Sequence, residues 1–281
     1  MNVKCEQTLP DLIPKMDKHL RKILERGTNQ LWESTFIYKQ IEKRKEDSIF
    51  SLKDHIRAMV YSMLSSGTSW NNIMLNADIE TGYITPVDKI FYNYDLVKIS
   101  DISPEYLRDK LKEIHCASQY TLKQMSALIN VNIPKLKAIE TEYGSIDTYY
   151  QEFIKLDTTL KTLVLVLSTS GSKDKFLQMD TALVCEYLRN VGYDMAKPDR
   201  HIRRILGSNI LACSEKEVVP VYEAFDIVQT CAKEINKSVA EVDYILWSYC
   251  AKGYGEICTL NNPNCDVCVM KENCNLYNKS N

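Results

Sequence analysis

Four cysteines near the C-terminus constrain what this chain can fold into more than any other feature. Cys258, Cys265, Cys268 and Cys274 follow the spacing C-x6-C-x2-C-x5-C. The residues after 251 carry little apolar pattern, so this segment could not fold without a cross-link, which the cysteines can supply. Thiolates are soft ligands that suit zinc or an iron–sulfur cluster. Zinc sites normally use two close cysteine pairs, and the single C-x2-C pair here favours an iron–sulfur cluster. Zinc remains the second alternative and two disulfides the third.

The other six cysteines are scattered along the chain, several of them within apolar helical patterns. We expect them to be small buried hydrophobic side chains rather than ligands. They are Cys5, Cys116, Cys185, Cys213, Cys231 and Cys250.

Scarce chain breakers and helically spaced apolar residues predict an all-α fold. Of the 281 residues 45% are apolar, and only 9 Gly and 8 Pro interrupt them. The clearest stripe runs from 52 to 64, with Ser51 placed to cap it. Ser103 followed by Pro104 begins another helix, which continues to Ile114. Further helices are expected at 12–24, ending near Gly27, and at 120–130, 133–143, 146–156, 158–168, 176–191, 216–234 and 238–250.

Neither a membrane span nor a secretion signal is expected. The longest purely apolar run, Leu163 to Leu167, is far shorter than the ~20 residues that a membrane span requires. The N-terminal segment lacks the apolar core of a signal peptide. The net charge of −2 provides no global attraction for nucleic acid, so a DNA site would depend on a local basic patch. The sequence therefore predicts a soluble, cytoplasmic protein.

The segment 197–207, KPDRHIRRILG, places a carboxylate at the start of a helix among basic residues. Asp199 has four Lys or Arg residues and one His around it in the sequence. These positive charges would keep the carboxylate ionised and would also attract phosphate. From the residues alone, a capping role for Asp199 is the simpler interpretation and a catalytic role is the alternative.

Both motifs resemble those of the helix–hairpin–helix DNA glycosylase superfamily. The cysteine spacing resembles the iron–sulfur cluster loop of endonuclease III and adenine-glycosylase-like enzymes. The segment VAEVDYILWSYC, at 239–250, resembles the helix that leads into that loop. The segment around Asp199 resembles the V/P-D-x-H-x-x-R motif that carries the essential aspartate of the superfamily. The resemblance spans roughly residues 50–275 and is strongest towards the C-terminus.

This resemblance implies a DNA glycosylase that excises a damaged or modified base from double-stranded DNA. It implies a [4Fe–4S] cluster on the four C-terminal cysteines, most simply a structural staple, and Asp199 as the catalytic carboxylate. The aspartate would stabilise the oxocarbenium-like charge of the departing sugar or activate the attacking water. His201 and Arg203 are candidate phosphate contacts. The protein is expected to act as a monomer.

The hairpin departs from the L-P-G-x-G-x-K-T-A pattern of the superfamily. In the matching segment, 176–182, Phe176 and Gln178 replace the two glycines and Asp180 replaces the lysine. The stretch TSGSK at 169–173, with Gly171, is an alternative phosphate site. Without the lysine amine no covalent imine can form. We therefore predict a monofunctional glycosylase, with a bifunctional enzyme using Lys173 or Lys175 as the alternative.

Two other DNA-facing features of the superfamily are absent. The loop TLNNPN between the first two cysteines has no Lys or Arg. Gly67 stands where relatives carry a Gln that fills the gap left by the flipped base, so Trp70, Asn71 or the segment 115–120 would fill it. The residues expected to contact DNA are Gly171, Lys173, Gln178, Arg200, His201, Arg203 and Gln119.

The resemblance implies two helical domains that flank a DNA-binding cleft. A helical barrel is expected at 50–168, and a hairpin and cluster domain at 1–49 and 169–281. The departures also fit a non-catalytic or lesion-sensing DNA-binding relative. A zinc-stapled helical interaction protein is a third alternative. The sequence does not identify the base that is excised.

Overall fold

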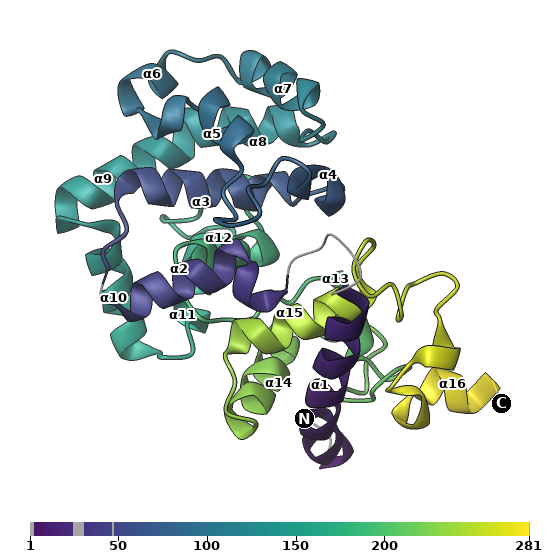
Figure 1. The fold of residues 1–281 in the computed structure, drawn as a ribbon. Coiled ribbons are helices and arrows are strands. Elements are labelled where there is room, and N and C mark those ends of the chain that lie inside the picture. The colour runs from purple at the N-terminus through teal and green to yellow at the C-terminus, as the bar shows by residue number, and fades with distance from the viewer. Residues whose placement is uncertain (1–2, 25–30, 47, 281) are drawn as a thin grey trace. The chain divides into compact units, whose positions relative to one another are not determined.

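The computed structural model describes residues 3–24, 31–46 and 48–280, and these residues form helices and loops without a strand (Figure 1). The predicted all-α class is therefore confirmed. None of the described helices is both long and apolar enough to span a bilayer. The chain divides into two compact units: unit 1 comprises Met1–Thr35 and Asp194–Asn281, and unit 2 comprises Phe36–Tyr193.

Unit 1 joins an N-terminal helix to the C-terminal third of the chain. α1 packs against α14 and α15, and α13 packs against both of the latter helices. Leu9, Ile13, Met16 and Leu20 form the buried stripe of α1. The helices are α1 (Val3–Leu24), α13 (Arg200–Ile205), α14 (Val221–Glu234), α15 (Val239–Cys250) and α16 (Asn275–Ser280), with short 3-10 turns at Trp32–Ser34, Cys265–Val267 and Lys271–Asn273.

Unit 2 is a bundle in which α12 packs along α3 and also contacts α2 and α11. Its helices are α2 (Phe36–Lys45), α3 (Leu52–Leu64), α4 (Trp70–Met74), α5 (Thr85–Ile90), α6 (Leu96–Ser100), α7 (Pro104–Glu113), α8 (Thr121–Ala127), α9 (Ile133–Tyr143), α10 (Ile146–Leu156), α11 (Lys161–Ser168) and α12 (Thr181–Asn190). A 3-10 turn lies at Tyr92–Tyr94, and a π-helix at Leu128–Asn132 links α8 to α9.

The bounds of the compact units differ from the domain bounds expected from the sequence. Unit 2 includes 36–49 and 169–193, which the sequence interpretation assigned to the hairpin and cluster domain. Long-range packing is the reason, because α2 and α12 lie against each other. Gly192, at φ 82°, approaches so closely that a Cβ there would lie 2.3 Å from the Gln40 carbonyl oxygen. Arg44 Nε also donates to the Val191 carbonyl at 2.7 Å. The proposed barrel at 50–168 stays a prediction.

Local signals in the sequence placed several helix ends correctly. Ser51 forms a capping box with Asp54, and Ser103 accepts a hydrogen bond from the Tyr106 amide. α9 and α10 have the predicted bounds, and Gly144 follows α9 with φ 79°. The end expected near Gly27 lies outside the described residues.

Other helices begin later than their apolar pattern suggests. α11 begins at Lys161 because the Asp157 carboxylate binds the amides of Thr159 and Thr162, which holds the chain in a turn. α14 begins after Pro220, which disfavours helix at the residue before it. α12 begins at Thr181 because 176–180 forms a separate turn.

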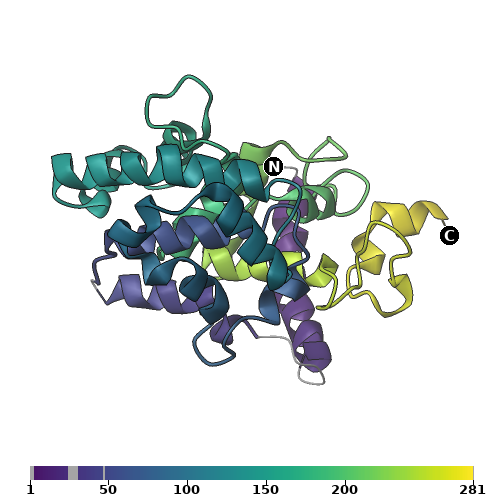
Figure 2. The same cartoon turned by 90° about the horizontal axis from the view of Figure 1, so that it is seen from above.

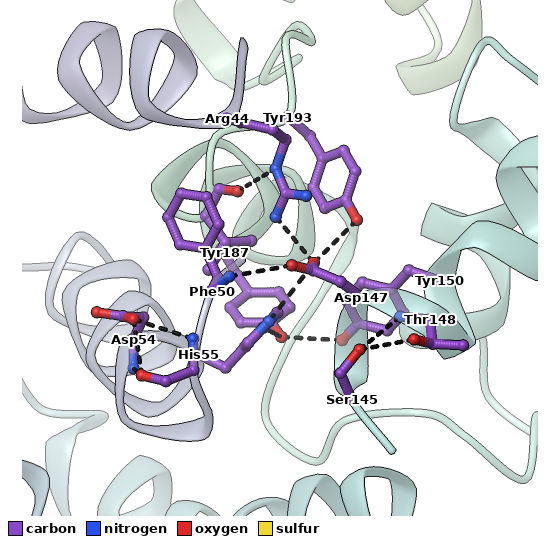
Figure 3. A network of polar contacts seen from close by, with 12 residues as sticks. Arg44, Phe50, Asp54, His55, Ser145, Asp147, Thr148, Tyr150, Tyr187 and Tyr193 are labelled. Carbon is purple, nitrogen blue, oxygen red and sulfur yellow. Dashed lines mark hydrogen bonds and ion pairs between the residues drawn. The ribbon is translucent and has the colours of Figure 1, made fainter. Parts of the chain in front are cut away.

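A largely covered aspartate, Asp147, connects α10 to α2 and to the loop that follows α2 (Figure 3). Asp147 Oδ1 accepts from Arg44 at 2.8 Å and from the Tyr193 hydroxyl at 3.2 Å. Its Oδ2 accepts from the Phe50 amide at 3.2 Å. Burial alone would raise the pKa of Asp147, but the neighbouring His55 and Arg44 outweigh burial and hold this pKa well below its usual range. Asp147 therefore acts as a tie between helices.

The same network continues through His55 to two tyrosines in the core (Figure 3). His55 is fully buried, and its Nδ1 lies 2.7 Å from the Tyr187 hydroxyl. That hydroxyl lies 2.8 Å from the Tyr150 hydroxyl, while His55 Nε2 lies 3.7 Å from Asp147 Oδ1. Burial lowers the pKa of His55 although Asp147 opposes this effect. The network thus joins α3, α10 and α12 in the core of unit 2.

Two of the scattered cysteines form a disulfide, which corrects the expectation that both are simple buried hydrophobes. Cys5 in α1 is bonded to Cys213, in the loop that follows α13. Neither residue has a sequence neighbour that signals the bond, because the two positions are brought together only by the packing of unit 1. The remaining four of the six are outside any disulfide and buried, as expected: Cys116, Cys185, Cys231 and Cys250.

Candidate functional site

Asp199 caps the N-terminus of α13 and keeps one carboxylate oxygen available. Its Oδ1 accepts hydrogen bonds from the His201 amide at 2.7 Å and the Ile202 amide at 3.2 Å. Oδ2 has no hydrogen-bond donor in the part of the chain that the structure describes, and Asp199 is only half-buried. The capping interpretation is confirmed. It leaves Oδ2 available for chemistry, because both bonds end on the other oxygen.

The residues next to Asp199 differ in how freely they could meet a ligand. Arg200 is exposed. Arg203 is bound within unit 1, because its Nε donates to the Val219 carbonyl at 2.6 Å and joins α13 to the chain before α14. His201 is half-buried, and burial, with help from nearby cationic side chains, lowers its pKa despite the opposing charge of Asp199. The roles expected for these residues at a phosphate stay predictions.

Arg204 links the helix of Asp199 to the cysteine segment. Its guanidinium donates to the Cys258 carbonyl and lies 3.6 Å from Cys258 Sγ. The sequence interpretation did not single out Arg204. The doubled arginine in RHIRR was the only available signal, since the partner lies 54 positions along the chain. One short helix therefore carries Asp199 at its start and contacts the first of the four cysteines near its end.

The C-terminal cysteine segment, yellow in Figure 2, is hydrogen-bonded to α15 and to the loop after α13. The Cys258 amide donates to the Tyr249 carbonyl, and the Tyr249 hydroxyl accepts from the Val269 amide at 3.0 Å. Further along, the Asn275 amide donates to the Ile210 carbonyl at 2.9 Å. Most of this segment is loop, which agrees with the expectation that it has no apolar core of its own.

The four cysteines lie in different surroundings, since Cys258 is buried while Cys265, Cys268 and Cys274 are partly exposed. Burial raises the pKa of Cys268, with Cys258 and Cys265 adding to the effect. Burial also raises the pKa of Cys265, with Cys274 and Cys258 contributing. The neighbouring Cys250 thiol and the Arg204 charge lower the pKa of Cys258 to about 6.

Within the described residues, no three His, Cys, Asp or Glu side chains are grouped closely enough to hold one metal ion. A cubane cluster is larger than one ion and holds its thiolates farther apart, so this finding does not test the iron–sulfur cluster, which stays a prediction.

The turn at 176–180 keeps part of the expected hairpin geometry without its glycines. Gln178, at the place of the second glycine, has φ 58°, the left-handed conformation that glycine adopts most easily. Phe176 is buried, and its amide donates to the Leu167 carbonyl at 2.9 Å. Asp180 caps α12 by accepting from the Leu183 amide at 2.9 Å. The amides of Gln178, Met179 and Asp180 have no acceptor within the described chain.

The lysines near this turn are engaged to different degrees. Lys175 Nζ donates to the Ser168 carbonyl at 2.8 Å, while the Lys173 side chain is exposed. Lys135, which the sequence interpretation missed, donates to the carbonyls of Lys173 and Lys175 at 2.7 and 2.8 Å. Burial lowers the pKa of Lys135. Gly171 is exposed with φ 92°, and nothing lies near the position of a Cβ.

The loop around Gly67 packs against the segment 115–120. Ser118 Oγ donates to the Ser66 carbonyl at 2.9 Å, and the half-exposed Tyr120 ring lies 3.1 Å from where a Gly67 Cβ would be. The adjacent Gln119 is exposed. The predicted site residues thus fall into two sets: Asp199, its neighbours and the cysteines belong to unit 1, and Gly171, Lys173, Gln178 and Gln119 belong to unit 2.

Comparisons with known proteins give little beyond this geometry. No protein-family profile and no curated protein matches the chain. A crystal structure of the Methanocaldococcus jannaschii 8-oxoguanine glycosylase/lyase in complex with 15mer DNA containing 8-oxoguanine is similar over 85% of this chain and 95% of that chain, with 19% sequence identity and a TM-score of 0.49.

Proposed function

We propose that the protein is a DNA N-glycosylase that excises a damaged or modified base from duplex DNA, with Asp199 as its catalytic carboxylate. The observation that carries the proposal is the arrangement on α13. The helix begins at an aspartate with an available oxygen, and its Arg204 contacts Cys258. The two sequence motifs that resemble the glycosylase superfamily are thereby joined by one structural element.

Asp199 would act on the sugar of a base rotated out of the duplex. The amides of His201 and Ile202 hold Oδ1 and so orient the carboxylate. Oδ2 would then face the positive charge that develops on the sugar as the N-glycosidic bond breaks, or would accept a proton from the attacking water.

Cys258, Cys265, Cys268 and Cys274 would hold a [4Fe–4S] cluster. When bound, the cluster would supply four fixed points for a segment that lacks an apolar core, and no catalytic step is assigned to it. Arg204 would place its positive charge beside the Cys258 thiolate. Zinc on the same thiols is the alternative, and it would serve the same structural purpose.

The turn at 176–180 would bind a DNA phosphate. Successive free amides around a left-handed residue form an anion-binding concavity, and the start of α12 adds its dipole. The Asp180 carboxylate lies at the same place and opposes an anion, although it also caps α12.

A monofunctional reaction is favoured because Asp180 replaces the hairpin lysine and the Lys175 amine is held by the Ser168 carbonyl. A lyase step through the exposed Lys173 is the bifunctional alternative. A non-catalytic DNA-binding relative is the second candidate function. It is favoured by the net charge of −2 and by the missing glycines of the hairpin.

The decisive experiment uses anaerobically purified protein and a panel of duplexes, each with one damaged base. Strand breaks that appear only after alkali would identify a monofunctional glycosylase and its substrate. Breaks without alkali, together with borohydride trapping, would identify a lyase. Release of no base from any duplex, with binding intact, would favour the non-catalytic relative.

The role of Asp199 is tested by Asp199→Asn, which should lower excision at least about 100-fold while preserving duplex binding. Asp95→Asn is a matched control, because Asp95 is also a half-buried aspartate that caps a helix through Oδ1, accepting from the amides of Val97 and Lys98. Equal loss in both variants would show that capping, not chemistry, is affected.

The cluster is tested by visible absorption and by iron, sulfide and zinc content. Cys274→Ser should lose the iron, whereas Cys231→Ser, at a buried cysteine of α14, should retain it. A colourless protein that contains zinc would contradict the cluster and support the zinc alternative.

A further inference from the structure

Asn132 is a fully buried side chain whose two polar atoms both bind the backbone of the turn at 176–180. Its Oδ1 accepts from the Leu177 amide at 2.8 Å, and its Nδ2 donates to the Leu177 carbonyl at 3.0 Å. The Asn132 side-chain amide thus bonds both the N–H and the C=O of Leu177, as the backbone of a neighbouring β-strand would. It fixes the position of the peptide groups on both sides of Leu177.

The π-helix explains how Asn132 reaches this position. Leu128–Asn132 forms a wider turn than the α-helices on either side of it. One extra residue in a turn rotates everything after it by about 100° around the helix axis, and such turns are often found at functional sites. Asn132 is the last residue of the π-helix. The direction of its side chain therefore depends on this wider turn.

The residue that follows Leu177 needs such support. Gln178 has φ 58°, which side chains with a Cβ adopt at a steric cost. Phe176 anchors the other side of Leu177 through its buried ring and its bond to the Leu167 carbonyl. The turn is therefore held on its N-terminal side by Phe176 and Asn132 and on its C-terminal side by the Asp180 cap.

We propose that Asn132 is a positioning residue that sets the phosphate-binding conformation of the turn at 176–180, in a chain whose turn has no glycine. The ligand is a phosphodiester group of duplex DNA, bound by the free amides of Gln178, Met179 and Asp180. The inference rests on the proposed function, because it assigns the DNA contact to this turn.

The test compares Asn132→Ala, Gln178→Gly and the double variant, measuring the dissociation constant for an undamaged duplex, the kcat and KM of excision, and the melting temperature. Asn132→Ala should weaken duplex binding about tenfold, the size expected when hydrogen bonds to a charged group are lost. It should raise KM and leave kcat unchanged, because Asp199 is not touched. Asn130→Ala is the control, since Asn130 is an exposed asparagine of the same π-helix whose side chain donates to Ser126 Oγ.

Rescue separates positioning from general destabilisation. Glycine reaches the left-handed conformation without steric cost. Gln178→Gly should therefore recover most of the binding lost in Asn132→Ala, while the melting temperature stays low because the two hydrogen bonds to Leu177 remain absent. Unchanged binding in Asn132→Ala would overturn the proposal. A loss of duplex binding that parallels the fall in melting temperature and is not recovered by Gln178→Gly would also overturn it.

Amide exchange distinguishes failure of this inference from failure of the proposed function. In Asn132→Ala, exchange of the Phe176 amide should accelerate, although its acceptor, the Leu167 carbonyl, is unchanged. Wild-type protein that binds no duplex would overturn the proposed function and the DNA role of the turn together. Unchanged exchange at Phe176 would overturn the positioning role itself, whatever the protein binds.

Discussion

Asp147 in unit 2 and Asp199 in unit 1 stand near the start of helices, yet their surroundings give them opposite roles. Both oxygens of Asp147 accept hydrogen bonds, and its side chain is 13% exposed. Asp199 receives two amide bonds on one oxygen and keeps the other available. The difference teaches that hydrogen bonds to both oxygens commit a carboxylate to a structural role, whereas an unused oxygen is necessary for a reactive role. It is not sufficient, because Asp95 also accepts its two amide bonds on one oxygen.

The largest effect expected from this comparison is on stability. Asp147→Asn should lower the free energy of unfolding by about 3 kcal/mol, because it leaves the Arg44 guanidinium without its charged partner. Asp199→Asn should change it by less than about 0.5 kcal/mol, because Asn caps a helix as well as Asp does. Denaturant unfolding of both variants measures the difference. Similar losses in the two variants would remove the distinction between the aspartates.

The disulfide gives the next effect and concerns unit 1. Cys213→Ser should lower the free energy of unfolding by about 2–4 kcal/mol. The bond ties α1 to the loop after α13, and its loss increases the conformational entropy of the unfolded chain. Unfolding of the wild-type protein with and without a thiol reductant measures the same quantity. A reductant that changes the wild type but not Cys213→Ser would assign the effect to this bond. Equal stability under both conditions would show that the bond is not formed in solution.

A smaller effect is the pH dependence that His55 gives to unit 2. Its folded pKa lies below the usual 6.5, so the unfolded chain binds more protons and stability falls as the pH drops below about 6.5. One such group contributes at most about 1.4 kcal/mol per pH unit. Unfolding between pH 7 and pH 5 should therefore be less pH-dependent in His55→Gln than in the wild type. The same slope in both proteins would exclude His55 as the cause.

The smallest effect concerns Asp180, the aspartate that caps α12. Asp180→Asn should tighten duplex binding roughly two- to fivefold, because it removes a negative charge beside the free amides at the start of α12 and keeps the cap. Fluorescence anisotropy at two salt concentrations measures the change, which should shrink at the higher one. Asp95→Asn serves again as the control. Binding unchanged by Asp180→Asn would place the phosphate elsewhere than this turn.

Much of the fold was predictable where the signal is local. The caps at Ser51 and Ser103 and the bounds of α9 and α10 follow from residues within one helical turn of each end. The start of α13 at Asp199 was equally readable, since a carboxylate before a helix binds its first amides. These features need only neighbours in sequence.

The candidate site was predictable only in part. The spacing of the four cysteines and the position of Asp199 identified the residues that carry the proposed chemistry. Arg204, which joins them, was missed because its partner is distant in the chain. Gln178 stands in place of a hairpin glycine, yet its φ of 58° is a left-handed value that the sequence does not predict for a residue with a Cβ.

By itself, then, the amino-acid sequence determined the helical class, many helix ends and the residues that could carry chemistry, since periodicity and caps act over a few residues. Only the tertiary structure decided which carboxylates are saturated, which cysteines pair and where the compact units divide. Asp147, Cys5 with Cys213, and α12 against α2 and α3 all depend on groups far apart in the chain. Their partners are chosen by the packing of whole helices, which no short stretch of sequence contains.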